Sequence, residues 1–339
     1  MHFVTIICPV FNEEKFIDNC MESIILQDYP KELLEVFIVD GMSIDRTKSI
    51  IEKYSQKYNY IKLLENKNKI VPHALNIGIQ KSKGDVIIRI DGHCEYPTNY
   101  ISVLVTKLFE LNADNVGGVW NTLPANKTLK AKAIAIASSH IFGVGDSKHK
   151  IGTTKIIETD TVPFGCFRRE IFDKIGLFDE DLIRNQDDEF NARLINSGGK
   201  IYLIPDLIIN YSARSSLDKM SKMYYQYGLF KPLVNKKLGK PTTLRQFFPA
   251  VFAFGIIIGL ILSLLSTWCF VLYIYVLSLY LILSVYFSFR SALEKEDWSL
   301  FFILPVVFLS IHLAYGFGYL IGIYKVVFRR KFNVIENRS

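Results

Sequence analysis

Residues 4–14 read VTIICPVFNEE, an apolar, β-rich run that turns into an acidic one. Residues 4–8 have the composition of a buried strand. Residues 13–27 then repeat apolar side chains at helical spacing, and residues 36–39 form a second apolar run that ends at Asp40. A strand, a helix and another strand in this order predict a parallel crossover unit.

The same alternation continues along the chain. Helical patterns over residues 46–58 and 72–82 alternate with strand patterns over residues 61–64 and 86–90. Strands joined through helices of this length lie parallel in one sheet, and the helices cover both of its faces. The predicted fold class is therefore α/β, with a Rossmann-like sheet that is mixed but mostly parallel.

Polar side chains follow three of these strands at the point where each ends. Asn12, Glu13 and Glu14 follow the first strand, Asp40 follows the second, and Asp91 with His93 follows the fourth. One acid in such a place commonly caps a turn or a helix. Because open α/β sheets bind ligands at the carboxyl ends of their strands, three such positions in register indicate a binding site.

Asp187, Asp188 and Glu189 form a second acidic group, at the start of a helical pattern that ends before Gly198. Acids are favoured in the first turn of a helix because they meet the positive end of the helix dipole. That preference accounts for one or two of the three acids. The full group therefore indicates a chemical role for at least one of them.

Apolar residues make up 50% of the 339-residue chain and are concentrated near its C-terminus. Residues 246–289 and residues 298–324 contain no charged side chain. A bilayer crossing takes about 20 apolar residues, so the first run has room for two crossings and the second for one. Both runs lack the charged side chains that a transport pathway usually needs, which argues against a transporter.

The distribution of charge predicts which side of the membrane the first domain occupies. The chain has a formal net charge of +7, and residues 213–245, just before the first apolar run, are rich in Lys and Arg. Met220, Met223, Tyr224 and Tyr227 recur there at helical spacing, which is typical of a basic amphipathic helix on the cytoplasmic leaflet. Packing of this helix against the first domain would demand the same pattern and is the open alternative. No secretory signal is recognisable before the first strand, and the scattered cysteines suit a reducing compartment.

These patterns divide the chain into four parts. We expect an α/β catalytic domain over residues 1–212, a basic amphipathic membrane-interface segment over 213–245, about three transmembrane helices over 246–327 and a basic tail over 328–339. The expected location is the cell (inner) membrane, as a multi-pass protein with a cytoplasmic catalytic domain. Three crossings would place the basic tail outside, against the positive-inside rule, so a re-entrant last segment is an open alternative.

Several ordered motifs resemble the family 2 inverting glycosyltransferases of the GT-A fold, over about residues 3–230. The motifs keep the family's order and spacing and read ICPVFNEE (7–14), VDGMSIDRT (39–47), ALNIG (74–78), DGH (91–93) and NQDDEF (185–190). The histidine of the DGH triplet and the C-terminal apolar helices are most similar to the subgroup typified by the succinoglycan biosynthesis transferases. The Gln-x-x-Arg-Trp signature of processive synthases is absent from the sequence, which disfavours a polymerase.

The resemblance implies roles for individual residues. The implied nucleotide-sugar-binding residues are Pro9, Asn12, Glu14, Asp40, Asn76, Arg89 and Asp91. Asp91 and His93 are the implied metal ligands, and with an imidazole ligand Mn²⁺ is as suitable as Mg²⁺. Asp187 is the implied general base, favoured by its register against Arg193. Gln186 replaces an acid that is common in relatives, so Asp188 is the open alternative.

The resemblance implies a metal-dependent hexosyl- or related transferase that moves one sugar from a nucleotide-diphosphate sugar to a lipid-linked (polyprenyl diphosphate) glycan. Such a reaction serves exopolysaccharide, capsule or cell-wall polysaccharide synthesis. Two alternatives stay open: transfer to polyprenyl phosphate itself, and a non-catalytic membrane scaffold that binds nucleotide sugars. The expected partners are the donor, the acceptor and the membrane, with no nucleic acid.

Overall fold

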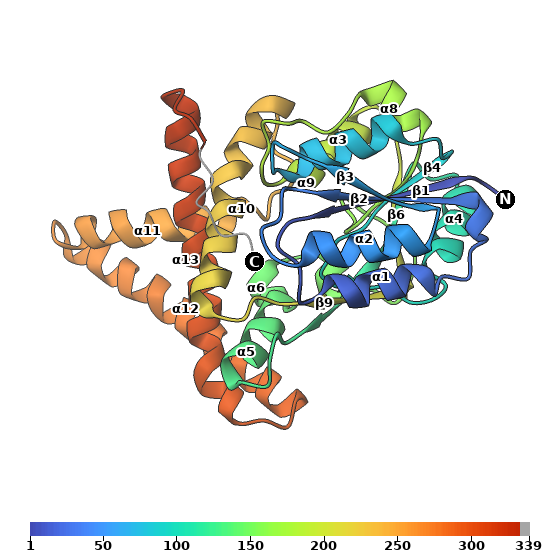
Figure 1. The fold of residues 1–339 in the computed structure, drawn as a ribbon. Coiled ribbons are helices and arrows are strands. Elements are labelled where there is room, and N and C mark those ends of the chain that lie inside the picture. The colour runs from blue at the N-terminus through green and yellow to red at the C-terminus, as the bar shows by residue number, and fades with distance from the viewer. Residues whose placement is uncertain (333–339) are drawn as a thin grey trace. The chain divides into compact units, whose positions relative to one another are not determined.

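The computed structural model describes residues 1–332 and divides the chain into two compact units. Within the described residues, the first unit comprises residues 1–121 and 152–211, and the second comprises residues 122–151 and 212–332. Part of the predicted basic tail, residues 333–339, lies outside the described residues. Figure 1 shows both units, which are described separately below.

The first unit alternates strands and helices through its N-terminal half and then becomes less regular. Its elements are β1 (Val4–Val10), α1 (Ile17–Ile25), the 3₁₀ helix η1 (Lys31–Leu33), β2 (Leu34–Asp40), α2 (Thr47–Lys57), β3 (Ile61–Glu65), α3 (Val71–Lys81), β4 (Val86–Arg89), β5 (Cys94–Glu95), α4 (Tyr100–Glu110), β6 (Asn115–Leu123), β7 (Ile157–Glu158), β8 (Cys166–Arg168), α8 (Glu170–Ile175), α9 (Gln186–Asn196) and β9 (Ile201–Ser212).

Within the described residues these strands form one nine-stranded sheet in the order β3-β2-β1-β4-β8-β6-β9-β5, and β7 pairs with β9. β1 runs parallel to both β2 and β4, and β2 runs parallel to β3. β8 is antiparallel to its neighbours β4 and β6. The predicted α/β class with a mixed sheet is confirmed. The parallel pairs join β1, β2, β3 and β4, whereas β8 with its neighbours, and β5 and β7 with β9, pair antiparallel.

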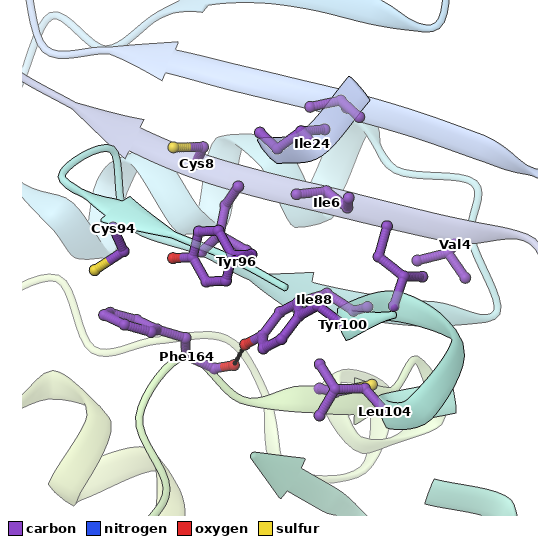
Figure 2. Packing of buried hydrophobic residues seen from close by; sticks show 14 of the residues in the cluster. Val4, Ile6, Cys8, Ile24, Ile88, Cys94, Tyr96, Tyr100, Leu104 and Phe164 are labelled. Atoms are coloured by element: carbon purple, nitrogen blue, oxygen red, sulfur yellow. Dashed lines mark hydrogen bonds between the residues drawn. The ribbon is translucent and has the colours of Figure 1, made fainter. Parts of the chain in front are cut away.

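Alternate side chains of the central strands pack into two separate cores. Ile6 of β1 and Ile88 of β4 point to the face that α1, α2 and α4 cover, where Tyr100 is fully buried (Figure 2). Ile7 of β1 points to the opposite face, which α3, α8 and α9 cover. Phe190 of α9 is fully buried there. Burial on both faces explains why the strands read as continuous apolar runs.

The second unit is helical. Its elements are α5 (Leu129–Ser138), α6 (Ile141–Val144), α7 (Lys148–Ile151), α10 (Leu217–Leu238), α11 (Phe247–Ser263), α12 (Thr267–Glu294) and α13 (Ser299–Val327). α10 packs along α13, and their backbones touch where Gly228 meets the carbonyl oxygen of Tyr315 and Gly318 meets that of Tyr225. The apolar face of α10, which the sequence assigns to the membrane surface, is therefore covered by α13.

Two of these helices, α12 and α13, are long and apolar enough to be candidate membrane spans. α12 has 28 residues, and only 6% of its most apolar window is buried. α11 is apolar but has 17 residues, and at about 1.5 Å per residue it falls short of a bilayer core of about 30 Å. The described residues thus contain two candidate spans of full length, where the sequence predicts about three.

Residues 122–151 belong to the second unit, although the sequence places them in the catalytic domain. Lys132 of α5 forms an ion pair with Asp297, with Nζ 2.9 Å from Oδ2. Nε2 of His312 lies 2.7 Å from the carbonyl oxygen of Phe142, and its Nδ1 lies 2.9 Å from the hydroxyl of Tyr280. Because a carbonyl oxygen only accepts, Nε2 donates and Nδ1 accepts from the tyrosine. The histidine therefore joins α6 to both α12 and α13.

Candidate functional site

The carboxyl ends of β1, β2 and β4 meet at one edge of the sheet, and the candidate residues lie there. Val10 of β1 pairs with Asp40, the last residue of β2. Ile7 of β1 pairs with Arg89, the last residue of β4. The loops that follow these strands therefore leave the sheet side by side, which brings Glu13 near to the segment after Arg89.

Glu13, Asp91 and His93 form a cluster that could hold a metal ion. One ligand atom from each residue can be chosen so that all three lie within 4.8 Å of one another. Nδ1 of His93 lies 2.9 Å from Oδ1 of Asp91 and 3.5 Å from Oε1 of Glu13. Two carboxylate oxygens and one imidazole nitrogen suit Mn²⁺ and are compatible with Mg²⁺. The side chains that the sequence proposes as ligands, Asp91 and His93, thus lie together, and Glu13 joins them.

The carboxylates of the cluster favour the positively charged form of His93. Burial of His93 lowers the pKa of its imidazole, but the carboxylates of Asp91 and Glu13 outweigh that effect and raise the pKa to about 10. In the metal-free protein the imidazole is therefore protonated at neutral pH. A metal ion needs the neutral ring, so metal binding here would release a proton.

An aromatic wall lies behind the cluster. The rings of His93 and Tyr211 are 5.5 Å apart. Tyr211 stacks on Trp120 at 4.2 Å with only 3° between their planes, and Trp120 in turn contacts Phe164 at 5.8 Å. These rings pack beside His93 and restrict the orientation of its imidazole.

The loops after β1 and β2 are joined by hydrogen bonds through residues predicted to bind the donor. Oδ1 of Asn12 accepts from the backbone N–H of Ile44 at 2.9 Å, and Oγ of Ser43 accepts from the backbone N–H of Asn12 at 2.9 Å. The buried carboxylate of Asp40 accepts from the backbone N–H of Ser43 at 3.1 Å. These contacts shape the edge of the sheet above β1 and β2.

Pro9, Glu14 and Asn76 have separate surroundings. Pro9 is half-buried within β1. Oε2 of Glu14 accepts from Nε of the exposed Arg46 at 3.3 Å. The amide of Asn76 is buried on α3, where it donates to the carbonyl oxygen of Phe178 at 2.9 Å and accepts from the N–H of Phe178 at 3.0 Å. Its role in donor binding stays a prediction.

The three acids of α9 have different environments. Asn185, with a φ of +62°, precedes the helix in a left-handed conformation. Glu189 is buried and forms two hydrogen bonds with Arg193 of the next turn. Asp187 is about one-third exposed, and its Oδ1 pairs with Nη1 of Arg89. Asp188 is half-buried in the same turn. Asp187 is thus linked by a direct ion pair to the end of β4.

The sequence places Glu13 after the first strand but does not identify it as a metal ligand, and it assigns the neighbouring Glu14 to nucleotide binding. The signal that separates them is the backbone at Asn12, whose φ is +54°. Asn is tolerated in this left-handed region, and the turn that it makes directs Glu13 toward His93. In the sequence, the sign of this turn is the position of Asn12, a short polar residue between the apolar Val10 and Phe11 and the acids Glu13 and Glu14.

Comparison with known proteins gives consistent results. A family model described as glycosyl transferase family 2 matches residues 5–176. The dolichyl N-acetyl-alpha-D-glucosaminyl phosphate 3-beta-D-2,3-diacetamido-2,3-dideoxy-beta-D-glucuronosyltransferase of Methanococcus voltae is 30% identical over 334 residues, which cover 96% of this chain and 98% of that protein. The succinoglycan biosynthesis protein ExoA of Rhizobium meliloti is 28% identical over 76% of this chain and 78% of that protein.

Among solved structures, the mannosyltransferase PcManGT from Pyrobaculum calidifontis, in complex with GDP-Man and Mn²⁺, has a TM-score of 0.59. The match covers 93% of this chain and 87% of that chain at 18% sequence identity, so it shows likeness of fold. Together with the sheet described above, it confirms the predicted GT-A architecture. Since the family model matches residues 5–176 and the Methanococcus voltae relative is 30% identical over 96% of this chain, the chain belongs to glycosyl transferase family 2.

Proposed function

We propose that this protein is a membrane-anchored, metal-dependent glycosyltransferase that moves one sugar from a nucleotide-diphosphate sugar to a lipid-linked glycan. The observation that carries the proposal is the meeting of two groups at one sheet edge. The cluster of Glu13, Asp91 and His93 can hold a cation, and Asp187 is joined to the same edge through Arg89. A cation held by the first group would stabilise a diphosphate leaving group, and Asp187 would act as the base.

The donor is proposed to lie along the carboxyl ends of β1, β2 and β4. Pro9 and Asp40 would face its nucleotide, and the loop contacts of Asn12 and Glu14 would shape that part of the site. A divalent cation, Mn²⁺ or Mg²⁺, held by Asp91 and its two neighbours would stabilise the negative charge of the leaving diphosphate.

The proposed reaction is a single in-line displacement. Asp187 removes the proton from an acceptor hydroxyl, the acceptor oxygen bonds to the anomeric carbon, and the bond from that carbon to the diphosphate oxygen breaks with inversion. No covalent intermediate forms on the protein. Asp187 is preferred to Asp188 as the base because its carboxylate is linked to Arg89 at the end of β4.

The proposed acceptor is a sugar that a polyprenyl-type lipid carries through a phosphate or diphosphate. The printed name of the Methanococcus voltae relative describes an acceptor of this class, a dolichyl phosphate that already bears a sugar. The candidate spans α12 and α13 suit such an acceptor because it resides in the membrane. We propose a multi-pass protein whose catalytic unit faces the cytoplasm, where nucleotide sugars are made.

Full-length protein in lipid nanodiscs tests the proposal. Labelled UDP- and GDP-sugars are supplied with Mn²⁺, Mg²⁺ or EDTA, together with N-acetylglucosaminyl polyprenyl phosphate, the corresponding diphosphate, or bare polyprenyl phosphate. We expect a metal-dependent product with one of the two sugar-bearing lipids. A product formed only with bare polyprenyl phosphate would show that the acceptor is the lipid phosphate itself and not a sugar that the lipid carries. If the protein binds the donor in a metal-dependent way but forms no product with any lipid of this panel, the result would favour a non-catalytic scaffold that binds nucleotide sugars.

A further inference from the structure

Arg89 is an unusual residue to find at the end of a central strand. Its side chain is almost wholly buried, being 11% exposed, and burying a charged group is costly unless it is paired. Asp187 supplies the ion pair, and Asp91 adds a second negative charge nearby. Nε of Arg89 has no hydrogen-bond partner among the described residues. Such an arrangement sacrifices stability and therefore calls for a functional explanation.

The position of Arg89 is fixed by rigid parts of the fold. Its backbone N–H donates to the carbonyl oxygen of Gly165 at 3.0 Å. Its guanidinium lies over the ring of Phe164, 5.7 Å from the ring centre. Phe164 has a φ of +48°, which is strained for an aromatic residue, and its carbonyl oxygen accepts from the hydroxyl of Tyr100 at 3.3 Å (Figure 2). The guanidinium therefore has little freedom to move.

Asp187 is held on one side only. Its Oδ1 pairs with Nη1 of Arg89, while Oδ2 lies 3.4 Å from Nε2 of Gln186, a weak contact. The Asp187 side chain is 36% exposed, about three times as much as that of Arg89. The ion pair thus anchors Oδ1, while the side chain as a whole remains partly accessible. A base that must receive a proton from a bound acceptor needs this arrangement.

We propose that Arg89 is a positioning residue, which fixes the carboxylate of Asp187 in the orientation needed to take the acceptor proton. This inference rests on the proposed function. It differs from the sequence-based expectation that Arg89 contacts the donor. Arg89 is fixed by Phe164 and engaged by Asp187, so the geometry assigns its charge to the base rather than to the diphosphate.

The two roles predict different kinetics. A positioning residue acts on the chemical step, so Arg89→Gln should lower kcat by about 10- to 100-fold and leave Mn²⁺-dependent donor affinity unchanged. Arg89→Lys keeps a charge near Asp187 and should recover part of kcat. In the Asp187→Asn background, Arg89→Gln should cause no further loss, because the group that it positions is already disabled.

The experiment measures kcat and donor KM for the wild type, Arg89→Gln, Arg89→Lys, Asp187→Asn and the double variant, all full length in nanodiscs. Donor binding is measured by calorimetry with Mn²⁺. Weaker donor binding with unchanged kcat in Arg89→Gln would overturn the inference, as would a multiplicative loss in the double variant. If Arg89→Gln does not fold, the same split between kcat and donor affinity is read from Arg89→Lys, where wild-type kcat would overturn the inference. A wild type without transfer would contradict the proposed function itself.

Discussion

Arg193 donates two hydrogen bonds to Glu189, with Nε 2.8 Å from Oε1 and Nη2 2.9 Å from Oε2. Nη2 also donates to the carbonyl oxygen of Leu177 at 2.8 Å, and Nη1 donates to that of Ile175. Arg193 therefore joins α9 to the end of α8. The last of the three clustered acids is a structural residue that supports the helix on which Asp187 lies.

Replacement of Glu189 should reduce stability. Glu189→Gln leaves Arg193 with a neutral partner, and the loss of charge-assisted hydrogen bonds should cost about 1–3 kcal/mol. Thermal melting of the full-length protein measures the effect. Glu65→Gln is the matched control, because the ion pair of Glu65 with Lys48 is exposed and should not affect the melting temperature. Equal melting temperatures for both variants and the wild type would contradict a structural role for Glu189.

The two remaining acids should differ in activity. Asp187→Asn should lower kcat by about 10²- to 10⁴-fold, since it removes the proposed base. Asp188→Asn should retain most of kcat, because Arg89 pairs with the neighbouring Asp187. Initial rates at saturating donor and acceptor measure both. If Asp188→Asn causes the large loss of kcat and Asp187→Asn does not, Asp188 is the base.

Neighbouring glutamates should differ in metal binding. Glu13→Gln removes one of the three candidate ligands and should weaken Mn²⁺ binding at least about tenfold. Glu14→Gln should leave Mn²⁺ affinity unchanged, because the side chain of Glu14 pairs with the exposed Arg46. Titration with Mn²⁺, followed by the electron paramagnetic resonance of the free ion, gives both affinities. Similar effects of the two substitutions would argue against the Glu13, Asp91 and His93 cluster.

His140 should make the stability of the protein sensitive to acid. Burial lowers the pKa of its imidazole below the ordinary value of 6.5, and its Nδ1 accepts from the backbone N–H of Phe142 at 3.0 Å. Below about pH 6.5 the unfolded state binds a proton that the folded state does not, so stability is lost as the pH falls. Above that pH the imidazole is neutral in both states and this loss disappears.

Melting temperatures between pH 7.5 and 5 test this expectation. His140→Asn retains a side-chain acceptor for Phe142 but does not titrate, so its melting temperature should fall less with acidification than that of the wild type. Parallel curves for the two proteins would show that another group causes the acid sensitivity.

The close contact of α10 with α13 should tolerate no added side chain. A Cβ at Gly228 would collide with the carbonyl oxygen of Tyr315, so Gly228→Ala should force the helices apart and cost about 1–3 kcal/mol. Gly255 of α11 has open space around it, and Gly255→Ala is the matched control without a steric effect. Thermal melting in nanodiscs compares them. An unchanged melting temperature for Gly228→Ala would mean that the backbones do not touch.

The sheet could be predicted from the sequence because its signals are local. The apolar runs that end at Asp40 and near Asp91 give strands and their direction, and parallel strands share a carboxyl edge. The pairing of Asp91 with His93 follows from two positions of one loop. Which of Glu13 and Glu14 joins them depends on one backbone angle at Asn12, which residue types alone do not specify.

Long-range packing was harder to predict. Periodic apolar residues show that α10 has a covered face, but not whether lipid or another helix covers it. The same holds for residues 122–151, whose partners Asp297 and His312 come much later in the chain. The buried hydrogen bonds between Asn76 and Phe178 span a comparable separation. No spacing rule within a motif reports such contacts.

The grouping of residues 122–151 with the C-terminal helices bears on how this enzyme can be produced for experiments. Cutting the gene after β9 would leave α5 and α6 attached to the catalytic part while deleting the helices that shield Ile134 and Phe142. Such a shortened protein would expose apolar side chains that the C-terminal helices bury in the full-length protein, and it would aggregate. Biochemists who want a soluble version must excise the inserted segment as well, or else purify the whole chain in detergent.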